Sequence, residues 1–170
     1  MKYHDLRACG PKCRSREHAN ELTGLLSRTS DESVLLSGMW QCCQCHKVQD
    51  AVGRYLLHVA AMYGRRRVCE WLVRLRRADV NVRTQENGWT PAHCALFYGH
   101  IDVLVALVRL GANLAKNDSD RLTPVEGLAL DRWMSTRHEL DPFGTTLIIS
   151  KHSKLDHSLI FITRLVYVLY

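Results

Sequence analysis

The sequence lacks the long hydrophobic runs that mark a secretory signal or a membrane span. Residues 1–7 contain no apolar core of the length that a signal peptide needs. No segment approaches the roughly 20 apolar residues that cross a bilayer, and Arg164 interrupts the apolar stretch near the C-terminus. These absences predict a soluble, intracellular protein that does not insert into a membrane. We expect it in the cytoplasm, with the nucleus left open.

Motifs of common enzyme classes are also missing. The sequence has no Gly-x-Ser-x-Gly, no Gly-rich phosphate-binding loop and no His-Glu-x-x-His, which argues against the usual nucleophile, nucleotide and zinc-protease sites. Asp118-Ser119-Asp120 resembles the start of a calcium loop. It lacks the Gly and the terminal Glu that such a loop requires, so a turn is favoured. We expect no catalysis and no cofactor.

The seven cysteines are an odd number and occur without a secretory signal, which favours reduced thiols over a disulfide framework. Cys42-x-x-Cys45-His46 matches a c-type haem attachment motif, but haem attachment needs an export route. Zinc is the stronger alternative, with Cys9 and Cys13 as a second ligand pair. Because the two pairs lie about 30 residues apart and the Cys9 pair has loose spacing for zinc, we interpret the cluster as metal-free cysteines in a loop.

Positive charge is confined to one part of the chain. Residues 54–83 contain eight arginines against only Glu70 and Asp79, which accounts for the whole net charge of +6. No aromatic residues interleave with the three consecutive arginines as stacking platforms for bases. A solvated helix face is therefore favoured over a nucleic-acid site, and an acidic protein partner stays open. The eight are Arg54, Arg65, Arg66, Arg67, Arg74, Arg76, Arg77 and Arg83.

One motif occurs three times at nearly constant spacing. Its copies occupy residues 53–58, 88–93 and 121–126. His58 and His93 are 35 residues apart, and Pro91 and Pro124 are 33 residues apart. Ankyrin repeats have a period of 33 residues and a Thr-Pro-Leu-His signature. The pattern predicts an all-α fold, namely a short ankyrin-repeat solenoid of about three repeats plus a divergent N-terminal helix pair.

Each signature residue has a physical role. Thr90 can accept a hydrogen bond from a free amide of the first helical turn, and Pro91 fits the first helical position, where its missing N–H costs nothing. Gly99 and Gly111 permit the left-handed conformation that ends a helix. We assign structural roles to Gly53, His58, Gly64, Gly88, Thr90, Pro91, His93, Gly99, His100, Gly111, Thr123 and Pro124.

Hydrophobic spacing predicts the second helix of each repeat. Val68, Trp71, Leu72 and Leu75 fall at i, i+3, i+4 and i+7 and predict one buried face. Residues 101–110 are apolar nearly all round, which requires neighbours on more than one side. The second repeat is therefore expected in the middle of the stack.

The flanking repeats depart from the signature. Tyr55-Leu56 replaces Thr-Pro in the first repeat, so we expect its helix cap to be lost, and Arg121 and Glu126 replace Gly and His in the third. Because about three repeats are the minimum for stability, an N-terminal helical cap should complete the stack. The predicted parts are a cap with a Cys-rich loop (1–49), repeats (50–84, 85–117 and a partial 118–130) and a poorly ordered tail (131–170).

Partner binding is expected at the hairpin tips and on the exposed face of the first helix of each repeat, the surface that ankyrin arrays commonly use. Trp, Tyr and Arg residues there favour an interaction hot spot. Phe97 either joins this surface or packs against a neighbouring repeat, and both interpretations stay open. The candidate binding residues are Arg83, Gln85, Glu86, Trp89, Tyr98, Asn117, Asp118 and Arg121.

With these residues placed, residues 9–142 resemble the ankyrin-repeat N-terminal region of the inhibitors of Bruton's tyrosine kinase. Lys-Cys-Arg-Ser at 12–15 and Phe-Tyr-Gly-His-Ile-Asp at 97–102 carry the resemblance most specifically. It implies an adaptor that binds and restrains a Bruton-type (Tec) tyrosine kinase. Longer members carry propeller repeats and BTB domains and engage a cullin-type ubiquitin ligase. We expect that link only in the longer forms, and this chain to be a truncated form or fragment.

Overall fold

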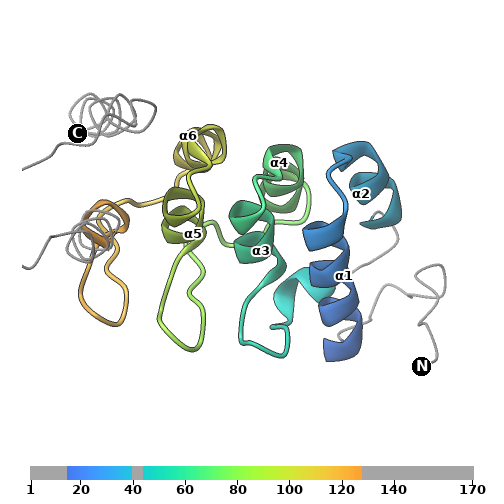
Figure 1. Cartoon of the computed structure of the whole chain (residues 1–170), viewed down its shortest axis with the longest axis horizontal. Coiled ribbons are helices and arrows are strands. Elements are labelled where there is room, and N and C mark those ends of the chain that lie inside the picture. The colour runs from blue at the N-terminus through green and yellow to red at the C-terminus, as the bar shows by residue number, and fades with distance from the viewer. Residues whose placement is uncertain (1–14, 40–43, 128–170) are drawn as a thin grey trace, which may run out of the picture. The chain divides into compact units, whose positions relative to one another are not determined.

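The computed structural model describes residues 15–39 and 44–127, whose helices stack in pairs (Figure 1). The elements in chain order are α1 (Arg16–Arg28), α2 (Glu32–Met39), the 3-10 turn η2 (Cys45–Lys47), α3 (Leu56–Met62), α4 (Arg66–Arg74), α5 (Pro91–Phe97) and α6 (Ile101–Arg109). Residues 124–127 are also helical. The inner helices α1, α3 and α5 contact one another in one row, and the outer helices α2, α4 and α6 form the second. The predicted all-α ankyrin solenoid is confirmed.

Several sequence predictions lie outside the described residues. These include the thiols of Cys9, Cys13 and Cys42 and the tail at residues 131–170. None of the helices in residues 15–39 and 44–127 has the length and hydrophobicity of a membrane span.

The N-terminal helix pair is present and packs against the first repeat. Ser15 begins α1 by accepting a hydrogen bond from the His18 amide at 3.4 Å. Leu22 and Leu26 on α1 are 1% and 0% exposed, and burial of a leucine side chain contributes roughly 1.5–3 kcal/mol. Contacts from α1 to α3 and from α2 to α4 extend both rows of the stack.

His58 ties the start of α3 to the next hairpin. Its Nδ1 accepts the Tyr55 amide at 3.2 Å, and Nε2 lies 3.1 Å from the Val82 carbonyl and 2.9 Å from the Trp89 carbonyl. Because Nδ1 accepts an N–H, the proton of the neutral ring is on Nε2. The expectation that Tyr55-Leu56 removes the cap is therefore wrong in part, since the ring of His58 still caps the helix.

His93 repeats this arrangement in the second repeat. The amide and hydroxyl of Thr90 lie 3.1 Å and 2.8 Å from Nδ1 of His93, and Nε2 donates to the Leu122 carbonyl at 3.2 Å. Pro91 is the first residue of α5, as its missing N–H favours. His100 makes a further tie, since its Nε2 donates to the Met62 carbonyl at 2.8 Å.

Glu126 supplies the cap of the third repeat in place of histidine. Its Oε2 accepts the Thr123 amide at 2.9 Å and the Thr123 hydroxyl at 2.7 Å, while the Glu126 amide donates to Thr123 Oγ1 at 3.3 Å. This reciprocal pair is a capping box. The hydrogen bonds from Thr123 lower the pKa of Glu126. The third repeat is less degraded at this point than its sequence indicated.

The C-terminal turn of α4 corrects one prediction. Val68, Trp71 and Leu72 are buried, but Leu75 is 64% exposed. Leu75 is the C-cap residue, so it follows the last helical turn and leaves the buried face that the spacing assigned to it.

Left-handed backbone follows two of the outer helices, α4 and α6. Gly111 has a φ of 95° after α6, whereas the corresponding residue after α4 is Arg77, with a φ of 56°. Positive φ also occurs at Gly53, Gly64, Gly88 and Gly99. Arg121, which takes the place of Gly53 and Gly88 in the third repeat, has positive φ as well. An L-residue in this conformation costs roughly 1–2 kcal/mol. Arg77 and Arg121 are thus two strained positions.

Replacing Arg77 with Gly should raise the free energy of unfolding by about 0.5–1 kcal/mol, because the relieved strain exceeds the entropy that glycine adds to the unfolded chain. The matched opposite change is Gly111→Ala, whose added Cβ meets no atom within 4 Å. Urea unfolding of both variants measures the effect. Arg77→Gly unfolding at lower urea than the parent would contradict this account.

Candidate protein-binding surface

One buried polar side chain closes each hairpin tip. Oδ1 of Asp50 accepts the Val52 and Arg54 amides at 3.0 and 2.8 Å, and Oδ1 of Asp118 accepts the Asp120 and Leu122 amides, both at 2.9 Å. Thr84 closes the tip that lies between these two in the sequence, because its Oγ1 accepts the Trp89 amide at 2.9 Å. The three closing residues are Asp50, Thr84 and Asp118, which recur every 34 residues and are 2%, 9% and 8% exposed.

This geometry corrects the prediction for Asp118. The carboxylate was a candidate contact for a partner, but it is buried and accepts two amides of its own turn. Its role is structural, and it confirms that Asp118-Ser119-Asp120 forms a turn.

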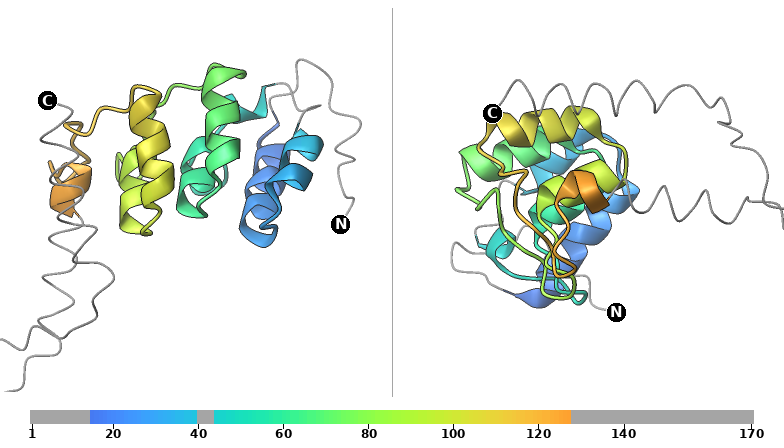
Figure 2. Two further views of the ribbon diagram at one scale, coloured as in Figure 1. Left: turned by 90° about the horizontal axis from the view of Figure 1, so that it is seen from above. Right: turned by 90° about the vertical axis from the view of Figure 1, so that its left-hand side faces the viewer.

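Backbone hydrogen bonds join one tip to the next. The Gln85 amide donates to the Gly53 carbonyl at 3.1 Å, and the Ser119 amide donates to the Asn87 carbonyl at 3.0 Å. All tips project from the same side of the stack (Figure 2). The tips therefore form a ladder with a fixed register.

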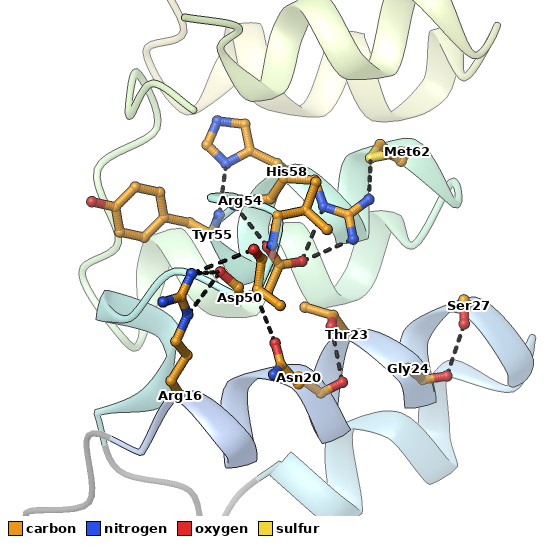
Figure 3. A network of polar contacts seen from close by, with 12 residues as sticks. Arg16, Asn20, Thr23, Gly24, Ser27, Asp50, Arg54, Tyr55, His58 and Met62 are labelled. Carbon is orange, nitrogen blue, oxygen red and sulfur yellow. Dashed lines mark hydrogen bonds and ion pairs between the residues drawn. The ribbon is translucent and has the colours of Figure 1, made fainter. Parts of the chain in front are cut away.

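Side chains of α1 complete this ladder at its N-terminal end (Figure 3). The guanidinium of Arg16 donates to the Asp50 and Ala51 carbonyls at 3.2–3.4 Å, and Asn20 Oδ1 accepts the Ala51 amide at 2.7 Å. These bonds take the place of a preceding tip. The N-terminal pair therefore caps the ladder as well as the core.

Three aromatic side chains gather beside α5, and we call them the aromatic cluster (Trp89, Phe97 and Tyr98). Trp89 precedes the helix, Phe97 is its last residue and Tyr98 is its C-cap. The Trp89 and Phe97 rings lie 5.0 Å apart between centroids, and the Phe97 and Tyr98 rings lie 5.3 Å apart, edge to face. The ring of Trp89 also stacks on the ring of His93, with 6.4 Å between their centroids. Phe97 is 40% exposed and Tyr98 is 48% exposed. Phe97 therefore packs on Trp89 of its own repeat and keeps an exposed face that a partner could contact.

Two of the three equivalent positions in the first repeat carry different side chains, namely Arg54 and Met62, whereas Tyr63 matches Tyr98. Arg54 occupies the position before α3 that Trp89 occupies before α5. The guanidinium of Arg54 pairs with Asp50 at 2.8 Å and lies 3.8 Å from the sulfur of Met62. The contact between the Trp89 and Phe97 rings is thus replaced in the first repeat by a paired cation beside a methionine, while Tyr63 keeps an exposed ring.

The other candidate binding residues are exposed at the tips. Arg83, Gln85, Glu86, Asn117 and Arg121 are all exposed. Arg83 also donates from Nε to the Gly88 carbonyl at 3.1 Å, which holds its side chain along the tip. Sequence reasoning missed Val52 and Tyr63, which are 54% and 39% exposed. The signal for Tyr63 was its 35-residue spacing from Tyr98.

The candidate zinc ligand Cys45 has a side chain outside the described part of the structure. Among the side chains that are described, no group of three or more His, Cys, Asp or Glu could hold a metal ion. Burial, reinforced by the charges of Arg76 and Lys47, lowers the pKa of His46 to about 4. Burial raises the pKa of the free thiols Cys69 and Cys94, which makes both unreactive.

Burial also keeps the two signature histidines neutral. It lowers the pKa of His58 to about 4, against the opposing effect of hydrogen bonds to the Trp89 and Val82 backbone. The pKa of His93 is lowered for the same reason. Each ring therefore keeps one donor and one acceptor nitrogen at neutral pH, as its ties require.

Comparison with known proteins agrees with this architecture. A family model of three ankyrin repeats matches residues 27–118. The chain belongs to the ankyrin-repeat family. As an ankyrin-repeat protein it is a protein-interaction module.

Similarity to curated proteins is more specific. The chain is 35% identical to the inhibitor of Bruton tyrosine kinase of Xenopus laevis, 34% to that of Mus musculus and 31% to that of Homo sapiens. Each match extends over 124 residues, which are 73% of this chain and 9% of the relative. The predicted resemblance is confirmed, and the chain spans about a tenth of the length of these relatives.

The neutral histidines predict a pH-dependent stability. As the pH falls below 6.5, His58 becomes protonated in the unfolded state, whereas in the folded state it stays neutral until about pH 4. His58 alone should therefore leave the free energy of unfolding unchanged above pH 6.5 and lower it by roughly 3 kcal/mol as pH 4 is reached. The lowered pKa values of His46 and His93 should add to this fall. Urea titrations across this range test this, with His58→Gln expected to lose part of the slope. An unchanged slope in that variant would count against the mechanism.

Asp118→Ala should lower the free energy of unfolding by roughly 2 kcal/mol, because two turn amides lose their acceptor in a buried position. The neighbouring exposed residue gives a control, since Asn117→Ala should stay within about 0.5 kcal/mol of the parent. Chemical denaturation measures both. Equal stability of the two variants would show that Asp118 does not close the tip.

Proposed function

We propose that this module binds a Bruton-type (Tec) tyrosine kinase and restrains its activity. The named relatives support this, because all three are called inhibitors of that kinase and match through the ankyrin segment. The proposal includes a non-catalytic role and a cytoplasmic location. Restraint would follow from occupation of a kinase surface, since the described residues offer a binding surface and no catalytic constellation.

The exposed aromatic cluster is the observation that carries the proposal. Tyr98 and Phe97 present large apolar rings on a rigid support, because Trp89 packs beneath Phe97 and its carbonyl is held by His58. A preorganised aromatic side chain loses little entropy on binding and can bury a large area. Aromatic residues at the centre of an interface, with polar residues around them, are typical hot spots. Exposed polar side chains of the tips supply that rim.

The direct test is the affinity of the full chain for a purified Bruton-type tyrosine kinase. Replacing both Phe97 and Tyr98 with Ala should weaken binding at least about 30-fold, since loss of a hot spot costs about 2 kcal/mol or more. Kinase activity at a fixed concentration of this double variant should recover in parallel. Isothermal calorimetry and a substrate phosphorylation assay measure the two effects.

A matched control separates this surface from general loss of apolar area. Val34 on α2 is 52% exposed, and Val34→Ala should change the affinity by less than about twofold. Thermal unfolding of each variant checks that the stack is intact. Kinase binding that survives the double change in a folded protein would rule out the aromatic cluster as the binding site.

A further inference from the structure

The arginines of residues 54–83 divide into two groups. Four of them contact groups within the fold. Arg54 pairs with Asp50, and Arg65 donates to the Leu26 carbonyl. Arg76 lies over the Trp71 ring, and Arg83 donates to the Gly88 carbonyl. The other four are exposed on α4 and the turn after it, namely Arg66, Arg67, Arg74 and Arg77. The second group forms a basic strip on the outer row of helices.

Carboxylates neutralise the strip at its N-terminal end only. Arg66 pairs with Glu70 at 3.1 Å, and Oε1 of Glu32 on α2 accepts the Arg67 amide at 2.9 Å. Among the residues that the structure describes, neither Arg74 nor Arg77 forms an ion pair. The uncompensated positive charge therefore lies at the C-terminal end of α4.

An exposed apolar side chain lies between these two arginines in sequence. Leu75 is 64% exposed, whereas its counterpart after α6, Leu110, is only partly exposed. We call Arg74, Leu75 and Arg77 the basic edge. It combines two unpaired cations with an apolar group of the size that a protein side chain can cover.

Backbone strain at Arg77 is independent evidence that this edge has a use. The turn after α6 has Gly111 at this position, where left-handed backbone is unstrained, but the turn after α4 keeps an arginine at a φ of 56°. Strain retained at a surface position where glycine would fit indicates a functional side chain.

We propose that the basic edge docks an acidic segment of a partner protein, whose carboxylates pair with Arg74 and Arg77 and whose apolar side chain covers Leu75. Charge complementarity selects an acidic partner. A nucleic acid fits less well, because a phosphate backbone offers nothing to Leu75 and the nearby Trp71 is 9% exposed beneath Arg76. This surface is on the outer row of helices, apart from the aromatic cluster on α5.

Fluorescence anisotropy of the full chain tests the proposal with a labelled peptide of alternating Glu and Leu at low salt. Arg77→Gly should weaken peptide binding by about fivefold, the effect of one exposed charge pair, while raising the unfolding midpoint. The variant is informative because reduced binding cannot then result from unfolding. Leu75→Ser should also weaken binding, and added salt should weaken it for the parent protein.

Matched positions on the neighbouring outer helix supply the control. Arg109 on α6 is exposed and is 35 residues from Arg74; Arg74→Gln should weaken peptide binding and Arg109→Gln should not. Equal losses in these two variants would overturn the proposal, as would unchanged binding by Arg77→Gly. Tighter binding of a single-stranded RNA of similar length, or equal binding of a Gln and Leu peptide, would also overturn it.

Discussion

The neutral imidazole of His58 makes contacts on which the register of the whole stack depends. One nitrogen accepts the amide that starts α3, and the other donates into the hairpin that leads to α5, where the carbonyls of Val82 and Trp89 converge on it. His93 makes the corresponding tie to Leu122. Because the ring is buried and neutral, both nitrogens are committed, and the position of Trp89 relative to α3 is fixed. The support of the aromatic cluster therefore begins one repeat before the cluster itself.

Some side chains form hydrogen bonds within the stack and others stay exposed, and this difference determines where a partner can bind. The tips are closed by Asp50, Thr84 and Asp118, whose polar atoms are used internally, so these residues contribute rigidity rather than recognition. In the proposed function, recognition falls to side chains that the ladder leaves exposed, chiefly Tyr98 with Phe97 on the inner row. The outer row carries charge instead, and Arg77 keeps its side chain there at the expense of backbone strain.

The period of the signature was enough to predict the stack, its helix order and the helix start at Pro91, since these follow from local capping chemistry. It could not show that Leu75 is exposed, because helical spacing does not reveal where the last turn ends. Nor could the signature show that Asp118 is buried. The same turn sequence is compatible with a carboxylate that faces solvent and with one that accepts the amides of its own turn. Glu126 replaced a histidine in the pattern yet kept the capping function, which only the hydrogen bonds of Thr123 reveal.

In the proposed function, the second repeat presents the binding surface on a frame that keeps its structure when the kinase binds. Hydrogen–deuterium exchange of the full chain, with and without a purified Bruton-type tyrosine kinase, tests it most directly. Kinase binding should add protection at the end of α5 and the following turn, residues 97–100, and should leave the amides of α2 unchanged. Protection that appears only on the outer helices, with exchange at residues 97–100 unaltered in the complex, would contradict it.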